Sequence, residues 1–141
     1  MPMATQLIVN VKNKPGTLAH LAAALGEAGV NIKAFHAPEV SPRSNRSGAK
    51  LRLLVSDLPQ ARIALRRQKM RFREESVLIL SLENRPGALS DVAELLREAR
   101  INVSCGYCTP SREGRRAIVV LTVSNTKKAL SLLRGRSLDE F

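Results

Sequence analysis

A short polar stretch that occurs twice holds the residue types best suited to binding a small polar molecule. Residues 13–18 read Asn-Lys-Pro-Gly-Thr-Leu, and residues 84–89 read Asn-Arg-Pro-Gly-Ala-Leu. An Asn side chain both donates and accepts hydrogen bonds, and Gly lets a ligand approach the backbone closely. Pro fixes φ and lacks an N–H group, so it favours the start of a helix, whose free N–H groups attract a carboxylate or a phosphate. Each stretch therefore predicts a corner that binds a small ligand.

Each corner lies between a predicted strand and a predicted helix. Leu7, Val9 and Val11 alternate before the first corner, which is typical of a strand. After it, apolar residues recur with the spacing of one helical face, namely Leu18, Leu21, Ala22, Leu25 and Ala28. Equivalent positions of the second copy lie 71 residues on (84 − 13), and the next strand of each copy opens with a second asparagine, Asn31 or Asn102.

The rest of each copy follows the same order of elements. A polar loop, an alternating strand, a helix that Asp57 caps and a short strand complete the first copy, and the second copy repeats them. The order β-α-β-β-α-β predicts the α+β class, with two tandem ferredoxin-like units whose antiparallel sheets carry their helices on one face. We expect a first domain at residues 1–74 and a second at 75–141. The last strand of the second should be short or missing, because few residues remain for it.

The composition agrees with a chain that builds its own core. Hydrophobic residues make up 44% of the 141 residues, enough for a core that needs neither metal nor disulfide. The chain opens with Met-Pro-Met-Ala-Thr, without the basic and apolar segments of a secretory signal. No apolar stretch approaches the roughly 20 residues of a membrane-spanning helix. We therefore expect a cytoplasmic protein with no membrane partner.

The formal charge of +11 leaves a second hypothesis open, a basic module that docks on nucleic acid or on an acidic protein. In this alternative the Pro-Gly corners are only structural. The basic residues that would carry it are Arg62, Arg66, Arg67, Lys69, Arg71 and Arg73, with Arg43, Arg46, Arg112, Arg115 and Arg116 in or beside the loops. Aromatic residues make up only 3% of the chain, and no nucleic-acid-binding motif is present, which argues against nucleic acid. We expect these charges to form a solvated face.

The remaining reactive residues form no catalytic or metal-binding constellation. Cys105 and Cys108 make a C-x-x-C on a predicted strand, where a spacing of three puts the side chains on opposite faces. A zinc site would need four ligands, and the chain has no second pair of cysteines. His20 adjoins the helical stripe and is expected at the surface. We predict no enzyme activity, no metal and no cofactor.

The corner, helix and second strand together resemble the ACT domain, a small regulatory module that binds amino acids in enzymes of amino-acid biosynthesis. The resemblance covers nearly the whole chain as two units. It implies ligand-binding positions at both corners and at both second strands: Asn13, Pro15, Gly16, Thr17, Leu18, Asn31 and Ile32, with Asn84, Pro86, Gly87, Ala88, Leu89, Asn102 and Val103. Serine-binding members carry a His two residues before the corner Asn. This chain has Val11 and Leu82 there, so the resemblance does not imply serine.

The function that the resemblance implies is allosteric control by an amino acid. ACT domains typically pair edge to edge, and the effector lies between the corner of one unit and the second-strand start of its neighbour. The chain would then be a stand-alone regulator that acts by binding alone or by docking on a separate enzyme or transporter. We expect a homodimer, because the short last strand leaves a sheet edge open. Arg100 stands where the first copy has Gly29, so we expect the two helix ends to differ.

Overall fold

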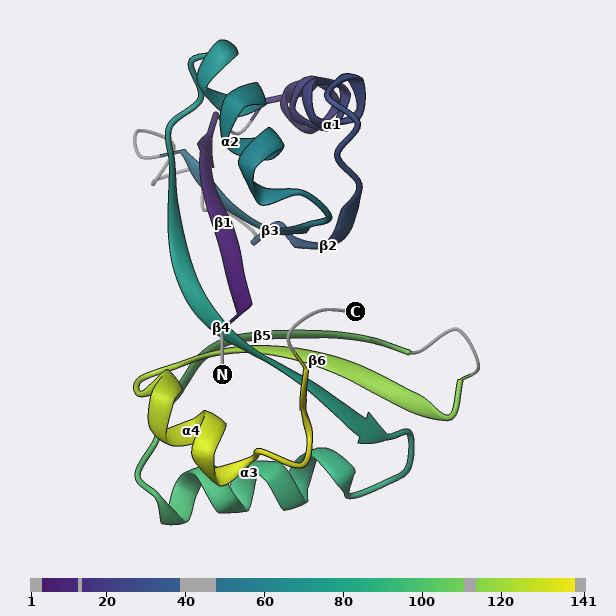
Figure 1. Ribbon diagram of the computed structural model, residues 1–141, viewed down its shortest axis with the longest axis vertical. Coiled ribbons are helices and arrows are strands. Elements are labelled where there is room, and N and C mark those ends of the chain that lie inside the picture. Colours follow the sequence, from purple (N-terminus) through teal and green to yellow (C-terminus); the bar gives the residue numbers. More distant parts are fainter. Residues whose placement is uncertain (1–3, 13, 39–47, 111–113, 139–141) are drawn as a thin grey trace. The chain divides into compact units, whose positions relative to one another are not determined.

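The computed structural model describes residues 4–12, 14–38, 48–110 and 114–138. The chain divides into an N-terminal unit, Thr5–Glu75, and a C-terminal unit, Ser76–Phe141. Each unit has its own sheet, two helices and its own core (Figure 1). The predicted α+β class, with ferredoxin-like β-α-β-β-α-β units, is confirmed.

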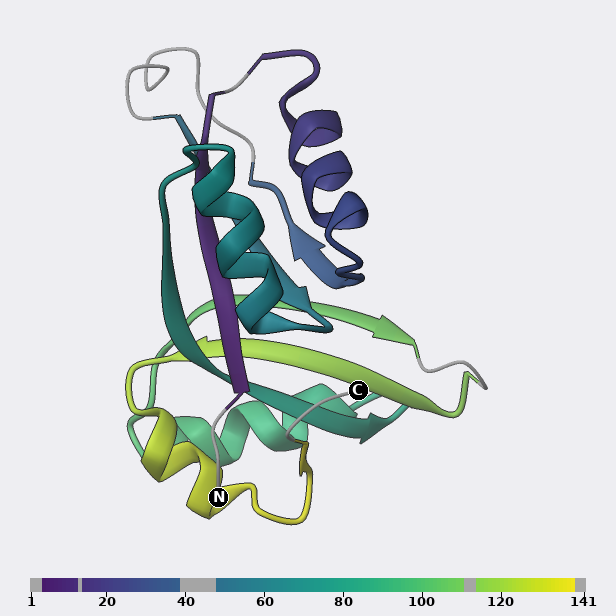
Figure 2. The same ribbon diagram turned by 45° about the horizontal axis from the view of Figure 1, so that its top comes forward.

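The N-terminal unit forms a four-stranded antiparallel sheet in the order β2-β3-β1-β4. Its elements are β1 (Ala4–Val11), α1 (Thr17–Glu27), β2 (Ile32–His36), β3 (Ala49–Val55), α2 (Leu58–Arg67) and the first part of β4 (Phe72–Glu83). In the β1–β3 pair, Val9 lies opposite Leu51. The Asn10 N–H donates to the Arg71 carbonyl at 2.9 Å, so the end of β1 lies beside the residues that lead into β4 (Figure 2).

The C-terminal unit repeats this arrangement with the second part of β4 in the place of β1. Its elements are α3 (Ala88–Glu98), β5 (Val103–Pro110), β6 (Arg116–Val123), α4 (Thr126–Leu132) and β7 (Ser137–Leu138). Strand β4 lies between β6 and β7, and β5 pairs with the other side of β6. Strand β7 is described over two residues, Ser137 and Leu138.

Each core lies between the helices and one face of the sheet of its unit. In the N-terminal unit, α1 contributes the fully buried Leu21 and Leu25, which pack with Leu65 of α2 and with Leu7 and other strand residues. In the C-terminal unit, Val92 and Leu96 of α3 pack in the same way with Ala129 of α4 and with strand residues such as Leu78. Alternation along the strands and the 3.6-residue repeat of the helices bring these apolar side chains to one layer, as the pattern predicts.

The buried face of the first helix of each unit is narrower than the predicted stripe. Leu18 is 45% exposed and Ala22 is also exposed, and the equivalent Leu89 and Ala93 behave in the same way. At 3.6 residues per turn, the centre of the buried face passes between Leu21 and Leu25. Positions 18 and 22 lie on the flank of that face, so their inclusion in the core was wrong.

Candidate ligand-binding corners

Both corners are built by a glycine in the left-handed region at the start of a helix. Gly16 precedes α1 with φ of 89°, and Gly87 precedes α3 with φ of 87°. A side chain is strained at such φ values, and a Cβ added at Gly16 would meet no atom within 4 Å. Backbone conformation, and not lack of space, therefore requires glycine at this corner.

Neither glycine has a side chain that could cap the helix it precedes. The other two helices begin differently: Asp57 accepts a hydrogen bond from the Gln60 N–H at 3.1 Å, and Asn125 accepts one from the Lys128 N–H at 3.1 Å. The first-turn N–H groups of α1 and α3 receive no such side-chain cap. Side chains therefore cap α2 and α4, whereas α1 and α3 begin without a side-chain cap.

The structure brings the predicted corner residues together in each unit. Pro15, Gly16 and Leu18 are exposed, and Thr17 is half-buried. At the second corner Pro86 and Gly87 are exposed, Ala88 is buried, and Leu89 is 56% exposed. Asn13 lies outside the described residues. An apolar side chain at the first turn of both corner helices is thus available for contact with a ligand or with another protein surface.

Asn84 has a structural role at the second corner. Its side-chain amide donates to the Gly114 carbonyl at 2.8 Å, and its backbone N–H donates to the Arg115 carbonyl at 2.9 Å. These two bonds tie the corner to the start of β6. Replacing Asn84 would therefore disturb the fold of the corner as well as any ligand contact.

The second asparagine of each unit lies at the far end of the corner helix. Helices α1 and α3 have 11 residues each, which places Asn31 and Asn102 roughly 16 Å along the helix axis from the corners. Neither unit by itself brings its corner and its second asparagine together. Ile32 is half-buried and packs against the N-terminal core, whereas Val103 is 41% exposed.

A pair of hydrogen bonds fixes the backbone of each second asparagine. The Asn31 N–H donates to the Ser56 hydroxyl at 2.8 Å, and the Ser56 N–H donates to the Asn31 carbonyl at 2.9 Å. Asn102 and Ser124 form the same pair, with both distances at 2.9 Å. The backbone is thus held by a serine in both units, and the exposed asparagine side chains are not needed for this turn.

A pocket of about 680 Å³ opens at the N-terminal corner. Its walls come from residues 10–12, 14–17 and 20, and from residues 68–71 in the turn between α2 and β4. The turn lies there because β1 and β4 are antiparallel neighbours, so the end of one strand meets the start of the other. We refer to this cavity as the corner pocket.

Cationic side chains surround the corner pocket. Lys12, Lys14, Lys69 and Arg71 line it together with His20, and none of the described lining residues carries a carboxylate. All four Lys and Arg side chains are exposed. Within the described part of the chain, none of these four forms an ion pair. Among the residues that the structure describes, the pocket therefore carries positive charge without a compensating carboxylate.

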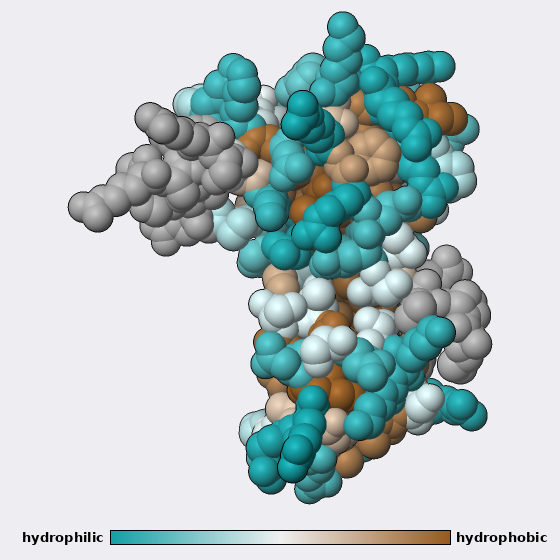
Figure 3. Space-filling model, turned by 90° about the vertical axis from the view of Figure 1, so that its left-hand side faces the viewer, coloured by the Kyte–Doolittle hydropathy of each residue, from teal (hydrophilic) through white to brown (hydrophobic). Residues whose placement is uncertain are grey.

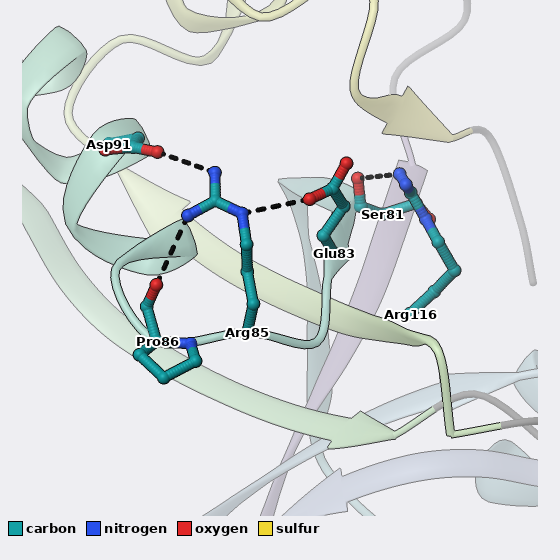
Figure 4. A network of polar contacts seen from close by, with 6 residues as sticks. All are labelled: Ser81, Glu83, Arg85, Pro86, Asp91 and Arg116. Carbon is teal, nitrogen blue, oxygen red and sulfur yellow. Dashed lines mark hydrogen bonds and ion pairs between the residues drawn. The ribbon is translucent and has the colours of Figure 1, made fainter.

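At the C-terminal corner the cationic side chain is already paired with carboxylates. Arg85 donates from Nη2 to Asp91 at 3.0 Å, from Nε to Glu83 at 2.9 Å, and from Nη1 to the Pro86 carbonyl at 3.2 Å (Figure 4). The hydrogen bond with Asp91, followed by that with Glu83, raises the pKa of Arg85 above its ordinary value. One cation here is paired with two carboxylates, whereas the described lining of the corner pocket has four Lys and Arg side chains and no carboxylate.

The pocket contains residues that the resemblance did not assign. Lys12, Lys69, Met70 and Arg71 were not among the predicted ligand-binding positions, and His20 was expected only at the surface. His20 is exposed as expected, and it also lines the pocket. The strand order of a ferredoxin-like unit could have predicted that Lys69, Met70 and Arg71 lie at the corner, because it places the end of the first strand beside the start of the fourth.

Three basic residues of the docking hypothesis are engaged by neighbouring side chains in the described part of the chain. Arg62 pairs with Glu74, Arg73 lies 3.6 Å from Glu75, and Arg66 lies over the Phe72 ring at 5.7 Å. Figure 3 shows hydrophilic side chains interspersed with smaller apolar areas on the visible face. Arg43, Arg46 and Arg112 lie outside the described residues.

The remaining reactive groups suggest no second centre in the described ranges. Cys105 and Cys108 lie on β5 as free thiols, the first half-buried and the second exposed. No group of three or more His, Cys, Asp or Glu side chains in the described residues is placed to hold a metal ion. None of the helices described has the length and apolar character that crossing a membrane requires.

Comparison with known proteins finds a family model that resembles part of the C-terminal unit. Residues 78–134 match the AHAS small subunit-like ACT domain. Protein BT0572 from Bacteroides thetaiotaomicron is 27% identical, with a TM-score of 0.86 over 96% of this chain and 92% of that one. A comparison with curated proteins finds none that matches the sequence.

Two further structures share the fold across both units. The regulatory subunit of aspartate kinase from Thermus thermophilus, in its ligand-free form, has a TM-score of 0.65 at 14% identity, over 94% of this chain and 91% of that one. The corresponding subunit from Thermus flavus has a TM-score of 0.62, also at 14% identity, over 95% and 93%. At this identity the likeness concerns the fold alone.

Proposed function

We propose that the chain carries two ACT domains in tandem and that it is a non-catalytic regulator that binds an amino acid at its corners. The proposal is carried by the corner pocket, whose volume of about 680 Å³ lies in the range of small-molecule sites. It is supported by the open helix N-termini, which offer N–H groups to a carboxylate. Two of the solved structures that share its fold are regulatory subunits of aspartate kinase.

We propose further that a complete site needs two units. In each unit the helix separates the corner from Asn31 or Asn102 by roughly 16 Å, which is more than a small amino acid can span. A neighbouring unit in an edge-to-edge pair would supply the second asparagine. Binding would then stabilise the paired arrangement, provided that the ligand binds it more tightly than the unpaired one.

We propose that a second copy of the chain supplies this neighbouring unit, so that the protein acts as a homodimer. The exposed Leu18 and Leu89 stand at the corners, where an apolar contact between chains would exclude water around the ligand. Light scattering at micromolar concentration tests the oligomeric state directly. A dimer in the presence of the effector is expected, and a monomer under all ligand conditions would contradict the paired site.

The ligand itself is tested by a thermal-shift screen with the twenty amino acids. At least one should raise the melting temperature, because a ligand that binds only the folded state stabilises it. Asn31→Ala and Asn102→Ala should remove the shift, because each takes away a proposed ligand contact. Both variants should still fold, because serine, and not the asparagine side chain, holds the backbone of each turn. A flat screen would contradict the proposed function.

The proposal also includes a regulated partner, which would be a separate enzyme or transporter. The activity of that partner should respond to the chain only when the effector is present.

A further inference from the structure

The corner pocket gathers like charges that nothing in its described walls neutralises. Lys12 and Lys14 come from the corner itself, and Lys69 and Arg71 come from the turn before β4. Like charges that line one cavity repel each other, and the repulsion is strongest where apolar walls limit access of water. Val11, Pro15 and Met70 form the apolar part of the lining, while the four cationic side chains are exposed, so water weakens their repulsion without removing it. An anion in the pocket would relieve this repulsion.

We infer that the corner pocket binds a small dianion, carrying two carboxylates or a phosphate, and that the C-terminal corner does not. This inference rests on the proposed function for the identity of the corner as a ligand site, and it adds the charge class of the ligand. A single α-carboxylate would use only part of the cationic lining. A second anionic group lets residues from both walls, such as Lys12 and Lys69, act on the same ligand.

The neutral lining residues agree with a ligand whose main feature is negative charge. Asn10, Thr17 and Gln68 offer side-chain donors to anionic oxygens. No described residue of the pocket offers a carboxylate to an ammonium group. An amino acid with an acidic side chain would therefore bind better than its amide, and a dicarboxylate without an amino group would also bind.

The C-terminal corner provides an internal contrast. Glu83 stands at the position equivalent to Lys12, and Asp91 stands at the position equivalent to His20, each 71 residues on. Both carboxylates bind Arg85, which is the counterpart of Lys14. The turn that carries Lys69 is also shortened here: Arg71 lies six positions after Leu65, whereas the equivalent Arg136 lies only three positions after Leu133. At the second corner a carboxylate therefore replaces Lys12, the counterpart of Lys14 is already paired, and Lys69 has no counterpart, while Arg136 keeps the charge of Arg71.

The test is isothermal titration calorimetry of the full chain at low ionic strength, with four ligands: aspartate, asparagine, succinate and inorganic phosphate. Aspartate and asparagine are nearly isosteric and differ by one charge, while succinate is a dicarboxylate without an amino group. We expect aspartate to bind at least about tenfold more tightly than asparagine, because one charge-assisted hydrogen bond is worth that much. At least one of succinate and phosphate should also bind. Binding should weaken as salt is added.

Three single variants locate the site. Lys12→Gln and Lys69→Asn should each weaken the dianion by about tenfold or more, since each removes one cationic partner. Asn tolerates the left-handed conformation that Lys69 adopts, with φ of 56°, so this variant keeps the turn. Lys127→Gln removes the same charge from an exposed position on α4 and should leave the affinity unchanged. Circular dichroism and the melting temperature without ligand check that all three variants fold.

Each contrary result has a distinct meaning. Equal affinity for aspartate and asparagine, or equal loss in Lys12→Gln and Lys127→Gln, would overturn the dianion site. Lack of binding by all four ligands would overturn it too. The proposed function would survive these results if the amino-acid screen still found a ligand that depends on Asn31 or Asn102. Conversely, a flat amino-acid screen with tight, Lys12-dependent binding of succinate or phosphate would reject the amino-acid effector and retain the dianion site.

Discussion

Arg100 adopts the same left-handed conformation as Gly29, with φ of 57° against 75°, at the residue that ends the corner helix of each unit. The Arg100 N–H donates to the Arg97 carbonyl, as the Gly29 N–H donates to that of Gly26, both at 3.0 Å. The expectation that the two helix ends differ is therefore wrong for the backbone. The C-terminal unit keeps the helix end and tolerates a strained residue there.

Arg100→Gly should stabilise the protein by roughly 0.5–1 kcal/mol, because glycine relieves the left-handed strain at a cost in unfolded-state entropy. Gly29→Ala is the matched change in the other direction and should destabilise by about 1 kcal/mol. Urea denaturation followed by far-UV circular dichroism measures both. If Arg100→Gly lowered the free energy of unfolding, contacts of the arginine side chain would stabilise the fold by more than the left-handed conformation destabilises it.

Gly48→Ala should destabilise the N-terminal unit more than Gly16→Ala does. Both residues have positive φ, 70° and 89°, but a Cβ at Gly48 would lie 2.4 Å from the Val11 carbonyl oxygen, whereas one at Gly16 meets open space. Gly16→Ala should cost about 1 kcal/mol from strain alone. Gly48→Ala adds a backbone clash, so its cost should be roughly 2 kcal/mol or more. The same urea titration ranks the two, and equal midpoints would contradict the close approach to Val11.

Ser56→Ala and Ser124→Ala should each destabilise by roughly 0.5–1.5 kcal/mol, because each removes the hydroxyl that accepts from an asparagine N–H. Asn31→Ala, in contrast, keeps the backbone donor and should leave the urea midpoint nearly unchanged. The comparison separates the turn from the ligand contact: serine variants change stability, and the asparagine variant changes effector binding. If Asn31→Ala unfolds the unit, the side chain has a structural role as well.

Glu83→Lys combined with Asp91→His should create a second, weaker anion site at the C-terminal corner. The two changes copy Lys12 and His20, and they release Arg85 from both of its carboxylate partners. Calorimetry with succinate or phosphate should then show an additional binding event per chain. The single change Lys127→Gln serves as the control for altered net charge. An unchanged titration would mean that the longer turn with Lys69 is indispensable for anion binding.

The local features of this fold could be predicted from neighbouring residues. Three local features depend on contacts within a few residues: strand alternation, the corners that begin with glycine, and the caps at Asp57 and Asn125. The tandem repeat is visible in the sequence itself. Backbone sterics and short-range hydrogen bonds determine them, so they are visible in the residue order. The width of the buried helix face was less predictable, because it depends on how the helix rotates against its sheet.

The corner pocket was decided only by the tertiary structure. The two parts of its lining, residues 10–12, 14–17 and 20 on one side and residues 68–71 on the other, are far apart in the sequence, and pairing of β1 with β4 brings them around one cavity. The sequence by itself determined two similar corners with the same turn and the same open helix start. Whether a given basic residue stays unpaired depends on which carboxylates the fold places beside it. The packed chain pairs Arg85 with Glu83 and Asp91, and it leaves Lys12 and Lys69 facing the corner pocket without such partners among the described residues.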